Sequence, residues 1–180
     1  MSIAVSKSEF NLRDKLNELD YGRVPYEKMP TGSVIQVVDH KANDHPTTNS
    51  NSYTTIAGTT FSITPRFKTS KIFVSWDFGT EHNGVINGLA FRTYRQVSGL
   101  NADGSDTLLR TQDQFSYPTQ TGWGAGAGGV NITFVDYPGT ILQCTYYLQW
   151  SIESSGTMYI NYNDGSNKHG ITAQAMEIRQ

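Results

Sequence analysis

The feature that most constrains the fold is a succession of short strand patterns that runs from Ser33 to the end of the chain. The stretches "TTFSITP" and "KIFVSWDF" alternate apolar and polar residues, as strands do when one face lies on a core and the other in water. Breakers such as "NADGSD", "YPGT" and "NDGSN" separate the patterns, and no convincing helix lies between them. We expect strands over residues 33–38, 53–64, 71–78, 88–97, 107–115, 130–137, 141–152, 157–162 and 171–178.

These patterns predict an all-β fold. Strands separated by turns at intervals of about 8 to 12 residues are typical of sandwiches and barrels. The chain has 180 residues, enough for one domain that buries a core without disulfides or metals. We therefore predict an antiparallel β-sandwich, jelly-roll-like, over residues 31–180.

The residues before the first strand predict a short N-terminal amphipathic helix. Ser6 and Glu9 have capping-box spacing, and Leu12, Leu16 and Leu19 form a stripe at helical intervals. A helix this short is marginal in water, so the leucine stripe needs a surface to lie against. Two alternatives stay open: the helix packs on the body of its own chain, or it docks on another subunit or a larger assembly.

A connector follows the predicted helix. The stretch "YGRVPYEKMPTG" contains Gly22, Pro25, Pro30 and Gly32, which favour an extended segment over a longer helix. Within it, Tyr26 is the expected anchor. Residues 1–30 are thus predicted to be a helix and connector that precede the β domain.

The most conspicuous segment is "GWGAGAGG", residues 122–129. It lacks the Lys and Ser or Thr of a phosphate-binding loop, and a strand pattern follows it where a dinucleotide-binding motif needs a helix. We interpret it as a loop between strands. An exposed Trp123 there would suit a sugar face or an apolar patch of a partner, so Trp123 and nearby Tyr117 are the candidate binding residues.

No catalytic or metal site is predicted. His40, Asp44 and His45 fall in a polar, turn-rich stretch without ligand spacing, and "NADGSD" lacks the spacing of a calcium loop. The histidines fit no particular nucleophile and acid. The single cysteine, Cys144, lies in an apolar strand pattern and is expected to be a buried filler. We expect a non-enzymatic protein without cofactors.

Charge and hydropathy exclude two classes of partner. The net charge is -2, and no run of Lys or Arg indicates nucleic-acid binding. The first residues, "MSIAVSKSEF", lack the basic region and long apolar stretch of a signal peptide or membrane span. We expect synthesis in a cytoplasm, no membrane insertion and no nucleic-acid partner.

Three stretches carry a resemblance to a known group of proteins: "FNLRDKLNELDYGRVPYEKMPTGSVIQVV", "FSITPRFKTSKIFVSW" and the terminal "ITAQAMEIR". In this order they resemble virion proteins of tailed bacteriophages, especially marine cyanophage-type fibre, knob and decoration proteins. Between residues 83 and 170 no resemblance is found, and specificity loops would lie there.

The resemblance implies a self-associating β-sandwich, commonly a homotrimer, that is displayed on a virion and carries no enzyme site. The N-terminal arm would then attach the protein to other virion proteins, through Phe10, Leu12, Leu16, Leu19 and Tyr26. The β domain would be a fibre tip or knob that assists attachment to a host surface glycan or protein. A capsid decoration protein that stabilises the head is the alternative, and a lectin-like module or carbohydrate-active enzyme is a further one.

Overall fold

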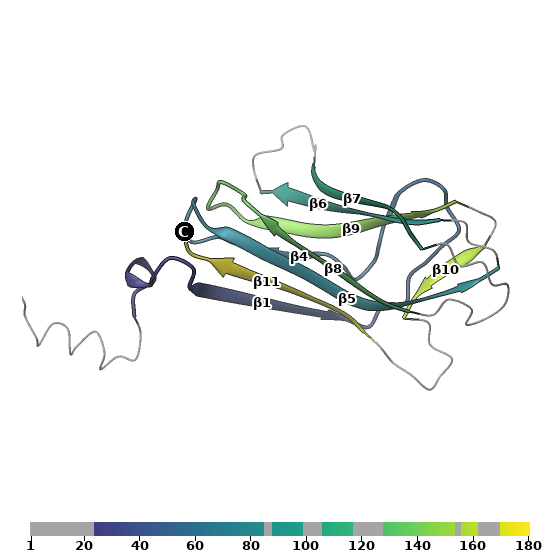
Figure 1. Cartoon of the computed structure of the whole chain (residues 1–180), viewed down its shortest axis with the longest axis horizontal. Coiled ribbons are helices and arrows are strands. Elements are labelled where there is room, and N and C mark those ends of the chain that lie inside the picture. Colours follow the sequence, from purple (N-terminus) through teal and green to yellow (C-terminus); the bar gives the residue numbers. More distant parts are fainter. Residues whose placement is uncertain (1–23, 85–87, 99–105, 117–127, 154–155, 162–169) are drawn as a thin grey trace, which may run out of the picture.

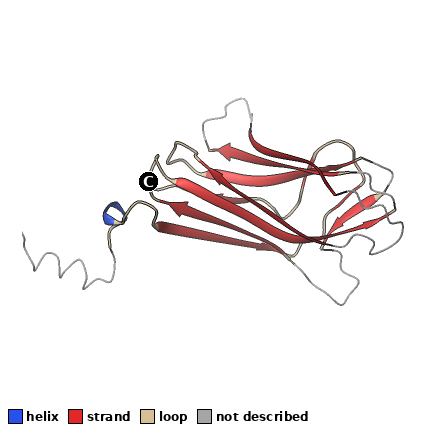
Figure 2. Cartoon of the chain, viewed as in Figure 1, coloured by secondary structure: helices blue, strands red, loops and turns tan. Residues whose placement is uncertain are grey.

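The computed structural model describes residues 24–84, 88–98, 106–116, 128–153, 156–161 and 170–180. They form two antiparallel sheets packed face to face, which confirms the predicted β-sandwich (Figure 1). Figure 2 shows that strands dominate the described chain, whose helical part is the short 3₁₀ turn η1 (Tyr26–Lys28). The predicted amphipathic helix, with Phe10 and the leucine stripe, lies outside the described residues.

The first sheet, sheet A, is built around one long strand, β5 (Lys71–Asn83). Residues 72–77 of β5 pair with both β11 (Ile171–Ile178) and β8 (Gly128–Asp136), so these two strands occupy its opposite edges. Next to β11 lies β1 (Val34–Ala42). The last residues of β5 pair with β10 (Thr157–Ile160), and β10 pairs with β2 (Thr47–Thr48).

Sheet B is centred on β9 (Cys144–Ile152). One edge of β9 pairs with β6 (Leu89–Val97), which in turn pairs with β7 (Thr107–Ser116). The other edge pairs with β4 (Phe61–Ile63) near its start and with β3 (Thr54–Thr55) near its end.

The core lies between the two sheets and follows from the alternation in the sequence. Every second residue of β5 from Ile72 to His82 is buried, and β9 buries Tyr146, Leu148 and Trp150 against it. Trp76 is fully buried, and its indole N–H donates to the carbonyl of Thr59 at 2.8 Å. Buried indole and phenol groups keep polar partners in this way, because an unpaired one would cost stability.

Three sequence-based expectations need correction. The single strand expected over residues 53–64 is two strands, because the chain turns at Gly58, which has a φ of +80°. The strand expected over residues 141–152 begins only at Cys144. His40, expected in a solvated loop, lies within β1, half-buried and stacked on the ring of Phe61.

Strand direction gives the sandwich two distinct ends. The base end is formed by the connector, residues 24–33, and by the loops of residues 64–70 and 137–143. At the left in Figure 1 it also holds the C-terminus. The distal end is where β1, β5, β7 and β9 finish and where β8 and β11 start.

Candidate assembly surface at the base end

Exposed apolar side chains gather in the base half of the sandwich. Eight large hydrophobic residues of the described chain are at least 40% exposed, and each belongs to the connector, to a base loop or to the base half of a strand. They are Val24, Val34, Val37, Leu108, Val135, Tyr137, Ile141 and Leu142. Leu108 lies on sheet B and Val37 and Val135 lie on sheet A, so the eight do not form one patch, but their shared placement marks the base half as the region for contacts with other proteins.

The connector is fixed to the β domain by the C-terminal residues. The backbone N–H of Gly32 donates to the carbonyl of Arg179 at 2.8 Å, and the N–H of Arg179 donates to the carbonyl of Ser33 at 3.0 Å. The Arg179 guanidinium also donates to the carbonyl of Met29. The chain therefore leaves the base end from a held position.

Tyr26, the predicted anchor, packs on its own β domain. The guanidinium carbon of Arg66 lies 4.1 Å from the centre of the Tyr26 ring, a cation–π arrangement. The loop that carries Arg66 is held in turn by Glu177, whose buried carboxylate accepts hydrogen bonds from the backbone N–H groups of Arg66, at 2.8 Å, and Phe67, at 3.3 Å. Tyr26, Arg66, Phe67 and Ile141 line one shallow groove.

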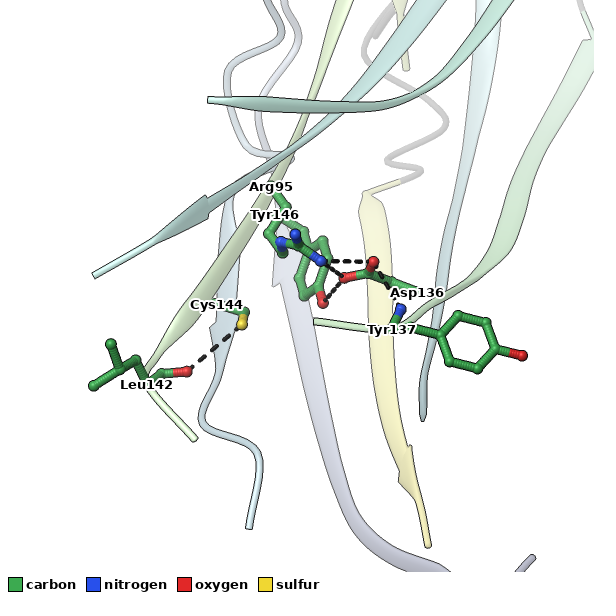
Figure 3. A network of polar contacts seen from close by, with 6 residues as sticks. All are labelled: Arg95, Asp136, Tyr137, Leu142, Cys144 and Tyr146. Atoms are coloured by element: carbon green, nitrogen blue, oxygen red, sulfur yellow. Dashed lines mark hydrogen bonds and ion pairs between the residues drawn. The ribbon is translucent and has the colours of Figure 1, made fainter. Parts of the chain in front are cut away.

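A buried polar network braces the two sheets just behind the exposed loop (Figure 3). Nη1 of Arg95, on β6, lies 2.7 Å from both carboxylate oxygens of Asp136, the last residue of β8. The hydroxyl of Tyr146, on β9, donates to Asp136 at 2.7 Å, and burial together with this carboxylate raises the pKa of Tyr146. Asp136 thus ties sheet A to two strands of sheet B.

The same carboxylate positions the loop that follows it. Asp136 accepts a hydrogen bond from the backbone N–H of Tyr137 at 2.8 Å, while the Tyr137 ring points away from the network (Figure 3). The ammonium of Lys71 lies 5.6 Å from the centre of that ring. The hydroxyl of Thr140 accepts from the N–H of Leu142 at 3.0 Å. The exposed apolar residues of this loop are therefore presented by a braced backbone.

Cys144 is the first residue of β9, directly after this loop, and is fully buried, as the sequence predicts. Its thiol contacts the carbonyl of Leu142 at 3.5 Å. Burial raises the pKa of the Cys144 thiol to about 11, although the nearby Arg95 opposes the shift. Because the thiolate is the nucleophilic form, this thiol is nearly inert at neutral pH.

At the distal end, polar groups hold the backbone and line a hollow on the surface. Asn161, with a φ of +49°, is buried, and its side-chain oxygen accepts from the N–H of Gly79 at 2.9 Å. Its backbone carbonyl oxygen forms a hydrogen bond with a ring nitrogen of His45. A shallow hollow nearby is lined by Asn49, Ser50, Asn51 and Glu153.

The structure places the remaining candidate residues as follows. His40, Asp44 and His45 do not converge, since His40 bonds to the carbonyl of Gly58 and His45 to that of Asn161. Within the described ranges, no group of three His, Cys, Asp or Glu residues is arranged to hold a metal. Nor does that part of the chain contain a helix long and apolar enough to cross a membrane.

Tyr117 and Trp123 lie outside the described residues. The residues on either side of them are described. Ser116 pairs with Leu89 and Gly128 pairs with Thr80, both at the distal end. Ser116 and Gly128 therefore both lie at the end opposite the connector.

Sequence reasoning missed the apolar loop of the base end. Ile141 and Leu142 were expected inside a strand, and Tyr137 at the end of another. A signal was present, because apolar residues flank the turn-forming "YPGT", and a turn exposes its neighbours to solvent.

Comparison with protein-family models and with curated proteins gave no match. Among solved structures, the chain is similar to that of the infectious bursal disease virus Gx strain, with 13% identity and a TM-score of 0.36, over 82% of this chain and 43% of that one. It is also similar to the D431N mutant VP2 protein of that virus, in derived T=1 particles, with 12% identity and a TM-score of 0.36, over 81% and 37%. A 2.6 Å structure of derived T=1 particles gives 13% identity and a TM-score of 0.38, over 82% and 37%.

The chain thus spans less than half the length of these viral proteins. With TM-scores below 0.5, no conclusion about function follows from the likeness.

Proposed function

We propose that this protein is a non-enzymatic structural component of a virion, attached through its base end and displaying its distal end. The observation that carries the proposal is the placement of exposed hydrophobics. All eight in the described chain lie in the base half, where the connector also leaves the body. Apolar surface left exposed on a folded chain is typical of a contact with another protein.

The N-terminal arm completes the attachment device. Residues 29–33 are held by Arg179 at the end that presents Tyr137, Ile141 and Leu142, and the leucine stripe precedes them in the sequence. Burial of one leucine contributes about 1.5 to 3 kcal/mol, and several copies that engage together would add avidity. Other virion proteins are the proposed partners of this end, and self-association as a homotrimer is part of the proposal.

The distal end would face the host. Ser116 and Gly128, the described residues on either side of Tyr117 and Trp123, lie at that end, which also holds the polar hollow of Asn49 and Glu153. An aromatic residue among polar groups is suited to a glycan or a protein surface. We therefore favour a fibre tip or knob over a capsid decoration protein.

The test is to delete residues 1–28 and to offer the shortened protein to particles assembled without it. The cut leaves Met29 and its bond to Arg179 in place, so the body should stay folded, with its melting temperature within a few degrees of the full chain. The shortened protein should no longer join particles. An insoluble or molten product, or normal incorporation, would contradict the role of the arm.

Host attachment and head stabilisation are separated by a second pair of measurements. Trp123→Ala should weaken adhesion of particles to host cells and leave the heat resistance of the head unchanged. If particles without the protein adhere normally to host cells but their heads break open on mild heating, the protein is a decoration protein.

A further inference from the structure

The outer face of sheet A carries an apolar row where a solvent-facing sheet should be polar. Val37 pairs with Met176, Met176 with Phe73, and Phe73 with Val135, so the row crosses β1, β11, β5 and β8. Phe73 and Met176 lie between buried residues, and Val37 and Val135 lie next to Val38 and Phe134, which pack against the core, so all four point outward. The two ends of the row, Val37 and Val135, are 49% and 45% exposed.

On its distal side the next two rows are polar. Asp39, Gln174, Ser75 and Thr133 form the next row, and Lys41, Thr172, Asp77 and Asn131 form the one after. On its base side lies a row of Val34, Ile178 and Lys71, so the apolar part of this face is concentrated near the base end.

The charges on this face are distributed by strand. In these rows β1 contributes Asp39 and Lys41, and β5 contributes Asp77, whereas the outward residues of β11 and β8 are uncharged. A contact that sets β1 of one copy against β8 of the next would bring charges beside hydrogen-bonding neutral groups. At that seam the charged residues of β1 meet uncharged residues of β8, so no like charges are opposed there.

We propose that this face is the contact between copies of this chain, arranged around an axis parallel to the strands. The choice of axis rests on the proposed function, because only such an axis points every base end toward the particle and every distal end away from it. Rotation about this axis leaves every residue at the same height along the axis. Val37 of one copy then lies level with Val135 of the next, and the apolar rows form one closed layer.

The same geometry keeps the polar rows in register. Asp39 of one copy lies level with Thr133 of the next, and Lys41 lies level with Asn131. Each of these pairs sets a charged group against a side chain that can accept or donate a hydrogen bond. The contact excludes water at one apolar layer and fixes the rotation of neighbouring copies at the polar ones.

The test is a pair of cysteines, Val37→Cys with Val135→Cys, in the full-length protein. Within one copy two strands lie between these positions, a separation of about 14 Å, too far for a disulfide, which needs Cα atoms within about 7 Å. Any disulfide formed must therefore join two copies. Cys144 does not interfere, because it is buried and its pKa is about 11.

Mild oxidation should convert most of the Val37→Cys, Val135→Cys protein to covalent oligomers on a non-reducing gel. The matched control joins Val37→Cys to Leu108→Cys, since Leu108 is 46% exposed but lies on sheet B. The control pair and each single variant should stay largely uncross-linked. Equal cross-linking of both pairs, or a clean monomer by light scattering at micromolar concentration, would overturn the contact.

A charge variant gives an independent readout. Val37→Lys with Val135→Lys should lower the oligomer's apparent mass to that of one chain, and Leu108→Lys should leave it unchanged. A double variant that stays oligomeric overturns the contact. Cross-linked oligomers that do not join particles overturn the proposed function and leave the contact standing.

Discussion

The two ends of the sandwich are stabilised by different means. At the base end a buried ion pair, Arg95 with Asp136, bridges the two sheets, and Tyr146 adds a hydrogen bond to it. At the distal end the buried Asn161 makes neutral hydrogen bonds, among them one to Gly79 of sheet A. The end that presents exposed apolar side chains is the end braced by charge.

The difference follows from what each end presents. Apolar side chains on a moving loop would pay an entropy cost on docking, so a contact surface gains from a fixed backbone. Asp136 supplies this fixation, because it holds both the sheets and the N–H of Tyr137. A polar end that stays in water carries no such requirement.

The largest effect should come from breaking the base brace. Asp136→Ala leaves Arg95, only 13% exposed, without its carboxylate, and removal of one partner of a buried pair costs about 3 to 5 kcal/mol. Urea unfolding measures the loss. Tyr146→Phe, which removes one hydrogen bond and keeps the ion pair, should cost about 1 kcal/mol. Equal costs for the two variants would mean that the ion pair does not brace this end.

A smaller effect is expected at the distal end. Asn161→Ala leaves the N–H of Gly79 without its side-chain acceptor, which costs about 1 to 3 kcal/mol by urea unfolding. Asn161→Gly, which also lacks the acceptor but adopts the φ of +49° without strain, is the control that separates the lost hydrogen bond from backbone strain. If Asn161→Ala destabilises more than Asp136→Ala, the comparison between the ends is reversed.

Alkaline pH should weaken the base end by a further step. Burial raises the pKa of Cys144 from 9 to about 11 and also raises that of Tyr146. The unfolded chain therefore loses these protons first, so the Cys144 contribution is complete below pH 9 and is lost as pH rises through about 11, and the Tyr146 contribution also falls as pH rises. Urea midpoints should fall between pH 9 and 11, less in the double variant Cys144→Ala, Tyr146→Phe. A flat profile would contradict the burial of these groups.

The smallest effect on stability is expected at the exposed loop. Ile141→Ser with Leu142→Ser changes side chains that are 50% and 40% exposed, so the free energy of unfolding should move by less than about 1 kcal/mol. Incorporation into particles should nevertheless fall at least tenfold. Matched substitutions at Asn49 and Asn51 of the distal hollow should leave incorporation unchanged.

More of the fold than of the candidate assembly surface could be predicted from the sequence. Alternation in β5 and β9 identified the strands and the core, because one face of each strand must be apolar. The split of residues 53–64 was missed, because an apolar Ile56 in the turn continues the strand pattern and only Gly58 breaks it.

The candidate surface was predictable only in part. Tyr26 was predicted as an anchor and packs on Arg66 of its own domain, while its docking role stays a prediction. The apolar row of Val37, Met176, Phe73 and Val135 joins four strands that are distant in sequence, and only the pairing register brings it together. The ion pair of Arg95 and Asp136 was missed for the same reason. Neither residue has a local pattern that marks it as buried.

The most direct test of the account compares the two ends on assembled particles. Ile141→Cys places a reactive thiol at the base end, and Asn49→Cys places one at the distal end, both at exposed positions. In the free protein both thiols should react with a maleimide reagent at similar rates. On particles, the account predicts that Ile141→Cys is protected at least tenfold while Asn49→Cys reacts as before; protection of Asn49→Cys alone, or equal reactivity of both, would contradict it.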